Sequence, residues 1–183
     1  MSLPQELPQG GVVVLVGNPS HGSRTSAVSR AVAAGLAAEV DSAVEVVELA
    51  DLGAEGVAAG DDRVHRARET VTGASLLVVA TPVYKAGYTG LLKLFLDTFE
   101  PTALESTVTV PVILTASGAH GALADLQLRL VLQAVGAVLP VPSFVLEEHH
   151  LDHLTQYVDA WQRRFLPAVS AVAHAVRPEE VLQ

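Results

Sequence analysis

Five short apolar runs, separated by longer segments of mixed polarity, dominate the hydrophobic pattern of the chain. The runs are mostly continuous and contain many β-branched residues, which is typical of strands buried on both faces of a parallel sheet. In chain order, the predicted strands are Val12–Val16, Val44–Leu49, Ser75–Ala80, Val112–Thr115 and Val141–Leu146. The pattern therefore predicts a sheet built from strands that are far apart in the sequence.

The segments between the runs carry apolar residues at steps of three and four, which predicts helices. The expected helices follow Ser23 to about Ala38, cover Asp61–Thr72, Gly87–Phe99 and Gly121–Val135, and resume near Leu151. We expect Pro167 to kink or end the last helix, because proline lacks the N–H that a helix interior uses. The small, acidic and glycine-containing stretch Ala50–Gly60 is predicted as a loop.

Strands that alternate with helices predict an α/β fold, with a doubly wound five-stranded parallel sheet and helices on both faces. The length suits the flavodoxin-like strand order 2-1-3-4-5. In such sheets ligands bind beyond the carboxyl ends of the strands, at the switch point of the strand order. Three loops should converge there: residues 17–26, 81–89 and 116–121.

Composition narrows the classes of protein to which this chain can belong. The 183 residues fit one domain, with residues 1–10 as a flexible arm, 11–177 as the domain and 178–183 as a tail. A net charge of −9 argues against nucleic acid or an anionic membrane as a partner. The chain has no cysteine, and its apolar runs predict neither a signal peptide nor a membrane span. A cytoplasmic protein is the expectation.

The stretch Gly11–Ser26, read GVVVLVGNPSHGSRTS, predicts an anion site. It places a strand, a turn of small residues and a hydroxyl-lined helix start in succession, and the first N–H groups of a helix are free to bind an anion. Arg24 adds a cation that can bind a phosphate. The stretch matches neither G-x-G-x-x-G nor a Walker A loop, whose lysine is replaced by Ser23. Helix capping alone would also explain the hydroxyl groups.

The other two loops are built from small residues. TPVYKAGYTG follows the third strand, and ASGAHG follows the fourth. Glycines let a ring or a neighbouring backbone approach closely, and we expect this of Gly87 and Gly90. Together with the anion site, these loops predict space for a flat heterocycle that carries a phosphate. Tyr84 and Tyr88 could instead pack the loop onto the sheet, and Lys85 could be a solvated charge.

The three motifs together resemble the NAD(P)H-dependent FMN reductase family, and most closely the reductase components of two-component alkanesulfonate monooxygenases. The resemblance runs from about Val12 to Ala137 and is strongest in TPVYKAGYTG and the Leu-Lys helix after it. It implies FMN as cofactor, NADPH or NADH as hydride donor and a flavin-dependent monooxygenase as partner. One position departs from the pattern, because Leu126 stands where these reductases usually place an aromatic residue or histidine.

The resemblance also implies a set of binding residues. The FMN phosphate would be surrounded by Ser20, Ser23, Arg24, Thr25 and Ser26. The isoalloxazine ring would be lined by Pro82, Val83, Tyr84 and Lys85, and its other edge and the nicotinamide would face Ser117, Gly118 and His120. Hydride passes between the two cofactors, so the protein supplies orientation and no catalytic side chain is expected.

Three histidines and Ser117 allow other interpretations of the chain. His149, His150 and His153 could suggest a metal, but they open an amphipathic helix without a ligand pattern, so no metal site is predicted. Ser117 is not a hydrolase nucleophile, because no G-x-S-x-G motif surrounds it. The alternative functions are a quinone, azo or metal-ion reductase that retains FMN, and a flavodoxin-type electron carrier.

The two helices after the third and fourth strands are apolar nearly all round, which predicts a homodimer or a homotetramer built on them. One stripe of the later helix contains Leu123, Leu126 and Leu130; the other contains Leu128, Val131, Leu132 and Val135. We expect Leu128 and Leu132 to face the partner.

Overall fold

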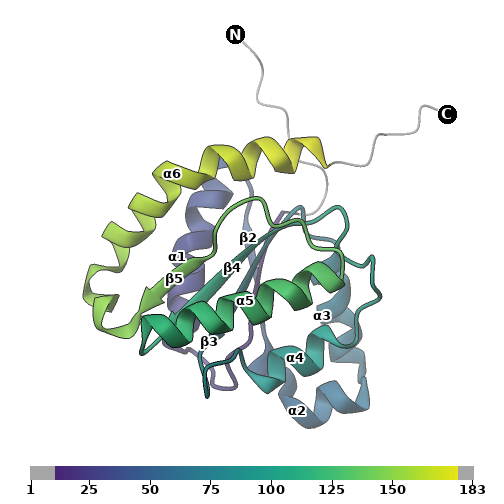
Figure 1. Cartoon of the computed structure of the whole chain (residues 1–183). Coiled ribbons are helices and arrows are strands. Elements are labelled where there is room, and N and C mark those ends of the chain that lie inside the picture. The colour runs from purple at the N-terminus through teal and green to yellow at the C-terminus, as the bar shows by residue number, and fades with distance from the viewer. Residues whose placement is uncertain (1–10, 177–183) are drawn as a thin grey trace, which may run out of the picture.

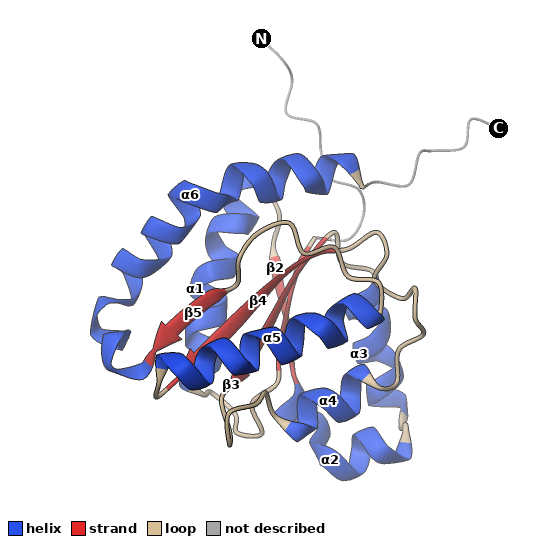
Figure 2. Ribbon diagram, viewed as in Figure 1, coloured by secondary structure: helices blue, strands red, loops and turns tan. Residues whose placement is uncertain are grey.

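A parallel sheet lies between two layers of helices in the computed structural model, which describes residues 11–176 (Figures 1 and 2). The strands are β1 (Val12–Val16), β2 (Val44–Glu48), β3 (Leu76–Pro82), β4 (Val108–Thr115) and β5 (Phe144–Glu147). Their order is β2-β1-β3-β4-β5 and all pairs are parallel. This confirms the predicted fold class and order. The predicted arm, residues 1–10, and the predicted tail, residues 178–183, lie outside the described residues.

The helices divide between the two faces of the sheet (Figure 2). They are α1 (Arg24–Glu39), α2 (Leu49–Ala59), α3 (Asp62–Thr72), α4 (Gly90–Leu96), α5 (Gly118–Ala134) and α6 (Leu154–Ala175), with a 3₁₀ helix, η1 (Glu148–His153), before α6. Buried side chains of α1 and α6 pack against one face, and those of α2, α3, α4 and α5 pack against the other. Alternate residues of each central strand join one core or the other, as side-chain alternation in a strand requires.

One predicted loop is a helix. Ala50–Gly60 was expected to be irregular, but α2 occupies it. Gly53 adopts a left-handed φ of 65° and divides the helix, so the apolar positions on its two sides do not share one helical period. Leu52 and Val57 are nevertheless buried against α3 and α4. The loop prediction was wrong because this helix is held by tertiary packing and does not carry a continuous stripe of apolar residues at helical spacing.

The fourth strand begins earlier than predicted, because Pro111 lies inside it and not before it. Backbone directions alternate along a strand, so Pro111 faces the same side as Thr109, whose N–H donates to the Val138 carbonyl at 2.8 Å. Strand β5 begins only at Phe144, opposite Val112, so no ladder bond is needed from Pro111 on that side. A proline is tolerated where its missing N–H would face no partner strand.

Helix α6 continues through Pro167 to Ala175, and its axis bends on the way, as Figure 1 shows. The helix crosses α1 closely at Gly35, where a Cβ atom would lie 2.0 Å from Nε2 of Gln162. The amide of Gln162 donates to the Val32 carbonyl at 3.2 Å. A small residue on α1 therefore allows this helix to pack against α6. Within residues 11–176, every helix is too short or too polar to cross a membrane.

Gly17 marks the junction between the sheet and the helix layer below it. Its N–H donates to the Ala80 carbonyl at 2.7 Å, which joins the end of β1 to β3. A Cβ atom at this position would lie 2.8 Å from Cβ of Leu92 and 3.1 Å from the Ala80 oxygen. Both neighbours are fixed, one by backbone and one by the first turn of α4. Only glycine fits between them.

We therefore expect Gly17→Ala to lower the free energy of unfolding by about 1–3 kcal/mol, the usual cost of overpacking a core. Gly90→Ala is the matched control, because a Cβ atom at Gly90 has no neighbour within 4 Å and should leave stability nearly unchanged. Urea denaturation monitored by Trp161 fluorescence measures both variants. Equal stability of Gly17→Ala and the wild type would contradict the packing described.

Candidate functional site

The carboxyl ends of β1, β3 and β4 lie side by side at one edge of the sheet, since Val16 pairs with Ala80 and Thr81 pairs with Ile113. The three predicted loops leave the sheet at this edge. The first connects β1 to α1, the second connects β3 to α4, and the third connects β4 to α5. The fold therefore brings the three loops together as predicted, at the place where doubly wound sheets bind ligands.

A buried asparagine shapes the first loop from inside. Asn18 is 8% exposed, and its side-chain oxygen accepts the Ser20 N–H at 2.9 Å, as in an Asx turn. Its Nδ2 donates to Oγ1 of Thr25 at 3.2 Å. The sequence analysis did not single out Asn18. The signal that could have found it is an asparagine at the second position after a buried strand, where its side chain can organise the turn.

The five residues predicted around a phosphate play two different parts. Ser20 and Arg24 are exposed and Ser23 is half-buried, so these three are open to a ligand. Thr25 and Ser26 are buried, at 1% and 3% exposure. The Thr25 hydroxyl accepts the bond from the Asn18 amide, and the Ser26 hydroxyl donates to the Glu48 carboxylate. Their hydroxyl groups therefore hold the loop in shape, whereas their backbone amides belong to the first turn of α1.

The first turn of α1 is suited to binding an anion. Ser23 caps it by accepting the Ser26 N–H at 3.2 Å, and the N–H groups of Arg24 and Thr25 belong to the first turn, where an α-helix supplies no acceptor. Gly22 before the cap has a φ of 56° and open space around the position of a Cβ atom. The positive end of the helix dipole points to this opening. These donors suit a phosphate. Ser23 also caps the helix, so capping and anion binding are compatible at this turn.

Two carboxylates that the sequence analysis did not foresee lie beside this turn. Glu148, the first residue of η1, approaches Arg24 with 3.0 Å between its Oε2 and the guanidinium Nη2. Glu48, the last residue of β2, accepts the bond from Ser26 and lies 3.7 Å from Nη2 of Arg30. Glu48 ends β2 and Glu148 directly follows β5, so the same topological argument that places the loops could have found both glutamates.

Two threonines join the second loop to the first. The Thr89 hydroxyl donates to the Gly17 carbonyl and accepts the Leu92 N–H at 3.2 Å, so it caps α4 while holding the end of β1. The Thr89 N–H donates in turn to Oγ1 of Thr81 at 3.1 Å. These buried bonds fix the two loops relative to each other. The register of Pro82 and Val83 is also fixed, since the Val83 N–H donates to the Leu114 carbonyl at 3.0 Å.

The second loop ends in a tight turn at its tip. Tyr84 and Gly87 exchange backbone hydrogen bonds of 2.9 and 3.1 Å, and the two residues between them, Lys85 and Ala86, have φ values of 53° and 62°. This is a type I′ geometry, which non-glycine residues adopt at a cost. The positive φ values of this turn therefore belong to Lys85 and Ala86 and not to a glycine.

Helix α5 supports this turn from one side. Nε2 of Gln127 donates to the Ala86 carbonyl at 3.4 Å, and a Cβ atom at Gly87 would lie 3.0 Å from Oε1 of the same glutamine. The close approach expected at Gly87 therefore exists, with a side chain as the neighbour. Tyr84 is 52% exposed at the tip, so it does not pack into the core. Tyr88 is half-buried, and burial raises the pKa of its hydroxyl.

The third loop is closed by Thr115. Its hydroxyl donates to the Ser117 carbonyl at 2.8 Å and the Ser117 N–H donates back at 3.2 Å. Gly118 opens α5 beneath the carboxylate of Glu147, whose Oε1 would lie 3.2 Å from a Cβ atom there. His120 is exposed at the rim. The loop offers backbone groups and one imidazole.

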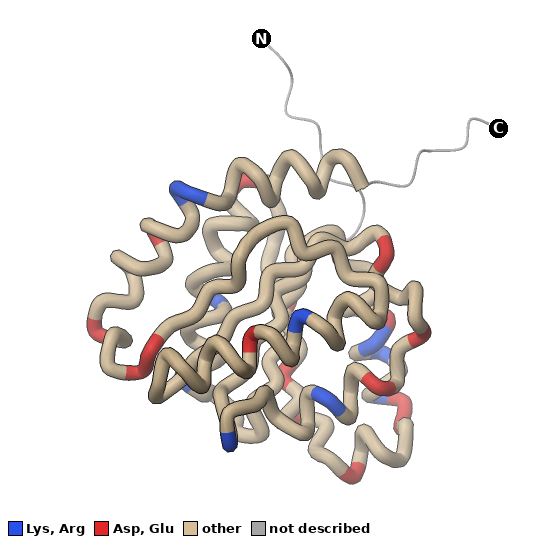
Figure 3. The backbone as a smooth tube through the Cα atoms, in the orientation of Figure 1, with Lys and Arg blue, Asp and Glu red and all other residues tan. Residues whose placement is uncertain are grey.

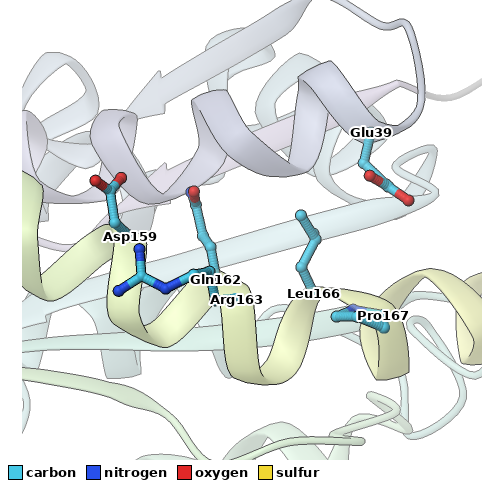
Figure 4. Close-up of a pocket in the computed structure, with 6 residues that line it drawn as sticks. All are labelled: Glu39, Asp159, Gln162, Arg163, Leu166 and Pro167. Atoms are coloured by element: carbon cyan, nitrogen blue, oxygen red, sulfur yellow. The ribbon is translucent and has the colours of Figure 1, made fainter.

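The described residues contain no cluster of three or more metal-ligating side chains. The His150 ring contacts the His149 ring on one side and the Tyr157 ring on the other, both tilted, with centroids 3.9 and 4.7 Å apart. The sticks of Figure 4 show a separate hollow between α1 and α6, lined by Glu39, Asp159, Gln162, Arg163, Leu166 and Pro167. This hollow lies along the later turns of α1, where Gln162 donates to the Val32 carbonyl and Glu39 ends the helix, and not at the first turn.

Comparison with known proteins identifies what this arrangement serves. The model of the NADPH-dependent FMN reductase family matches residues 11–152. The NADH-dependent FMN reductase SfnE of Pseudomonas putida is 33% identical over 180 residues, which cover 91% of this chain and 95% of the relative. The NADH-dependent FMN reductase SfnF of Pseudomonas fluorescens (strain Pf0-1) is 32% identical over 152 residues, with 78% and 79% covered.

Solved structures agree with the sequence relatives. The apo form of the NADH:FMN oxidoreductase EMOB matches with a TM-score of 0.78 and 30% identity, covering 92% of this chain and 91% of that one. The family, its oxidoreductase class and its use of FMN with NAD(P)H are those predicted from the sequence motifs. This chain belongs to the NADPH-dependent FMN reductase family.

Proposed function

We propose that this FMN reductase takes free FMN as a dissociable substrate, reduces it with NADH or NADPH, and releases the reduced flavin to a partner monooxygenase. The observation that carries the proposal is the open first turn of α1 at the end of β1, with Ser20, Ser23 and Arg24 around it. It offers backbone N–H donors to a phosphate without enclosing it. The supply of a monooxygenase rests on the resemblance of the motifs to reductase components of such systems.

The proposed flavin contacts follow the division seen in the first loop. The FMN phosphate lies against Ser20, Ser23 and Arg24 and against the free backbone N–H groups of Arg24 and Thr25, next to Ser26, whose own N–H is bonded to Ser23. The ring lies along Pro82, Val83, Tyr84 and Lys85. The third loop, with Ser117, Gly118 and His120, faces the nicotinamide.

The protein's part in the reaction is positional. FMN supplies the hydride-accepting chemistry when bound. The buried hydrogen bonds of Thr81 and Thr89 fix the first two loops relative to each other and so hold the binding groups in one arrangement. This lowers the entropic cost of bringing two nucleotides together. Among the described residues of the three loops, His21 pairs with a carboxylate, with 3.0 Å between its Nε2 and Oδ1 of Asp51, but both side chains are largely exposed and the pair lies at the loop proposed for the phosphate and not for the ring. No protein group is therefore assigned as acid or base.

Steady-state oxidation of NADH and of NADPH, followed by absorbance with and without added FMN, tests the function. We expect turnover that saturates with free FMN and is negligible without it. Turnover that requires a quinone and a flavin retained through gel filtration would indicate the alternative reductase. Absence of nicotinamide oxidation with FMN, without FMN and with a quinone would indicate an electron carrier.

Arg24→Ala tests the phosphate site. Loss of a charge-assisted hydrogen bond should weaken FMN binding by about tenfold, equivalent to about 1.4 kcal/mol, because Arg24 is largely exposed and already has a carboxylate partner. Riboflavin, which has no phosphate, should bind equally well to both proteins. Quenching of flavin fluorescence measures both affinities. Equal losses for the two flavins would place the phosphate elsewhere.

We also propose a homodimer, with pairing into a homotetramer as a further step, built on the outer face of α5. The structure corrects the stripe that was expected to face a partner, because Leu128 and Leu132 are fully buried in the core. Leu123, Leu126 and Leu130 point outward instead, at 48%, 58% and 59% exposure. Leu126, the position that departs from the family pattern, therefore lies at the centre of the exposed stripe.

The chemistry of the outer face of α5 supports this proposal. The exposed residues of the helix between Gly121 and Val135 are alanine, leucine and glutamine. Its two charged residues, Asp125 and Arg129, are half-buried and bond to Ser143. The rest of α5 is tan, and so uncharged, in Figure 3. An uncharged leucine stripe of this kind marks an interface more often than a free surface. Gln127 lies on the same face and contacts the turn at Ala86, so the interface and the flavin site are neighbours.

Leu126→Glu combined with Leu130→Glu should convert the oligomer to a monomer, because two charges would be buried at the contact. FMN binding should weaken with it. Ala168→Glu, which places one charge on the exposed side of α6, is the control and should not change the mass. Light scattering after gel filtration measures the assembly. A wild-type protein that is monomeric at micromolar concentration would contradict the proposal.

The expected cytoplasmic location rests on the sequence reasoning and stays a prediction.

A further inference from the structure

The cation proposed for the FMN phosphate already has a carboxylate partner in this structure. Arg24 is the first residue of α1, and its Nη2 lies 3.0 Å from Oε2 of Glu148. Glu148 follows the end of β5, so its carboxylate reaches the turn from another loop of the same sheet edge. The side chains are 63% and 35% exposed, respectively. The ion pair is therefore accessible to a phosphate in solution.

A second ion pair, between Arg30 and Glu48, neutralises the other arginine near the start of α1. Arg30, about two turns after the Ser23 cap of α1, lies 3.7 Å from Oε1 of Glu48 and donates to the Ser26 hydroxyl at 3.3 Å. The second oxygen of Glu48 is buried and has no hydrogen-bond partner in the part of the chain described. Each guanidinium near the start of α1 is thus matched by a carboxylate. An arriving phosphate finds backbone N–H groups but no unpaired arginine at this turn.

We propose that Glu148 competes with the FMN phosphate for Arg24 and thereby keeps the flavin affinity low enough for release. This inference rests on the proposed function, because it requires the phosphate to bind at this turn. An exposed ion pair is weak, so Glu148 can leave Arg24 when a phosphate arrives. A phosphate monoester carries a charge of about −1.5 to −2 at neutral pH, and the displaced carboxylate remains near it and repels it. Glu148 therefore opposes the phosphate both before and after binding.

Glu148→Gln tests this inference by removing the charge and keeping the shape of the side chain. We expect FMN to bind about threefold to tenfold more tightly, and riboflavin to bind as it does to the wild type. Flavin fluorescence quenching gives both constants without turnover. The gain for FMN should shrink as salt is raised, because exposed charges are screened. In the Arg24→Ala background the same substitution should give a clearly smaller gain, because the competition for Arg24 is absent and only the direct repulsion of the phosphate remains.

Asp152→Asn is the matched control, since Asp152 is an exposed carboxylate on the same 3₁₀ helix and makes no ion pair in the described part of the chain. It should leave both flavin affinities unchanged, which separates the Arg24 contact from a general change in net charge. Thermal unfolding of all variants checks that the fold is retained. Inorganic phosphate, used as a competitor of FMN, should inhibit binding more strongly with Glu148→Gln than with the wild type.

The outcomes separate this inference from the proposed function. If Arg24→Ala does not distinguish FMN from riboflavin, the phosphate site itself is wrong. If Arg24→Ala weakens FMN binding but Glu148→Gln leaves it unchanged or weakens it, the site stands and the competition is refuted, since Glu148 would then orient Arg24. A tighter affinity for both flavins, or a gain that persists undiminished without Arg24, also overturns the competition.

Discussion

The hydrogen bond from the Thr89 hydroxyl to the Gly17 carbonyl joins the two loops on which the proposed flavin site depends. The same hydroxyl accepts the Leu92 N–H and so fixes where α4 begins, while the Thr89 N–H is held by Thr81 at the end of β3. All of these groups are buried, so each bond must be satisfied inside the protein. The position of one loop therefore cannot change without changing the other. A flavin that contacts both loops meets a surface whose shape is set before it binds.

The polar groups around these bonds are of two kinds: some hold the first loop in shape, and others face outward, where the phosphate is proposed to bind. The side chains of Asn18, Thr25 and Ser26 are used inside the loop, and backbone amides and exposed Ser20 are left outside. Backbone donors suit a dissociable phosphate, because they are oriented by the helix and add no net charge. In a protein of net charge −9, the proposed phosphate binding at this turn relies on local dipoles and not on the overall field.

The turn at Lys85 and Ala86 connects the proposed flavin site to helix α5. Two consecutive non-glycine residues in the left-handed region persist only when their surroundings impose them. Here Gln127 of α5 contacts the turn from the same helix face that exposes Leu126. Packing against that face would therefore restrain the loop that lines the proposed flavin ring. This contact gives a physical reason for the leucine stripe and the site to be found on one side of the protein.

The sequence by itself determined the sheet, its strand order and the three loops, because continuous β-branched runs and hydroxyl-rich helix starts are local signals. It also determined the family, through TPVYKAGYTG and the phosphate-loop motif. Only the tertiary structure decided which leucines of α5 are buried, since both stripes have the same helical period. It also decided that Thr25 and Ser26 turn inward and that Glu148 pairs with Arg24. These outcomes depend on contacts between residues far apart in the chain, which no local pattern records.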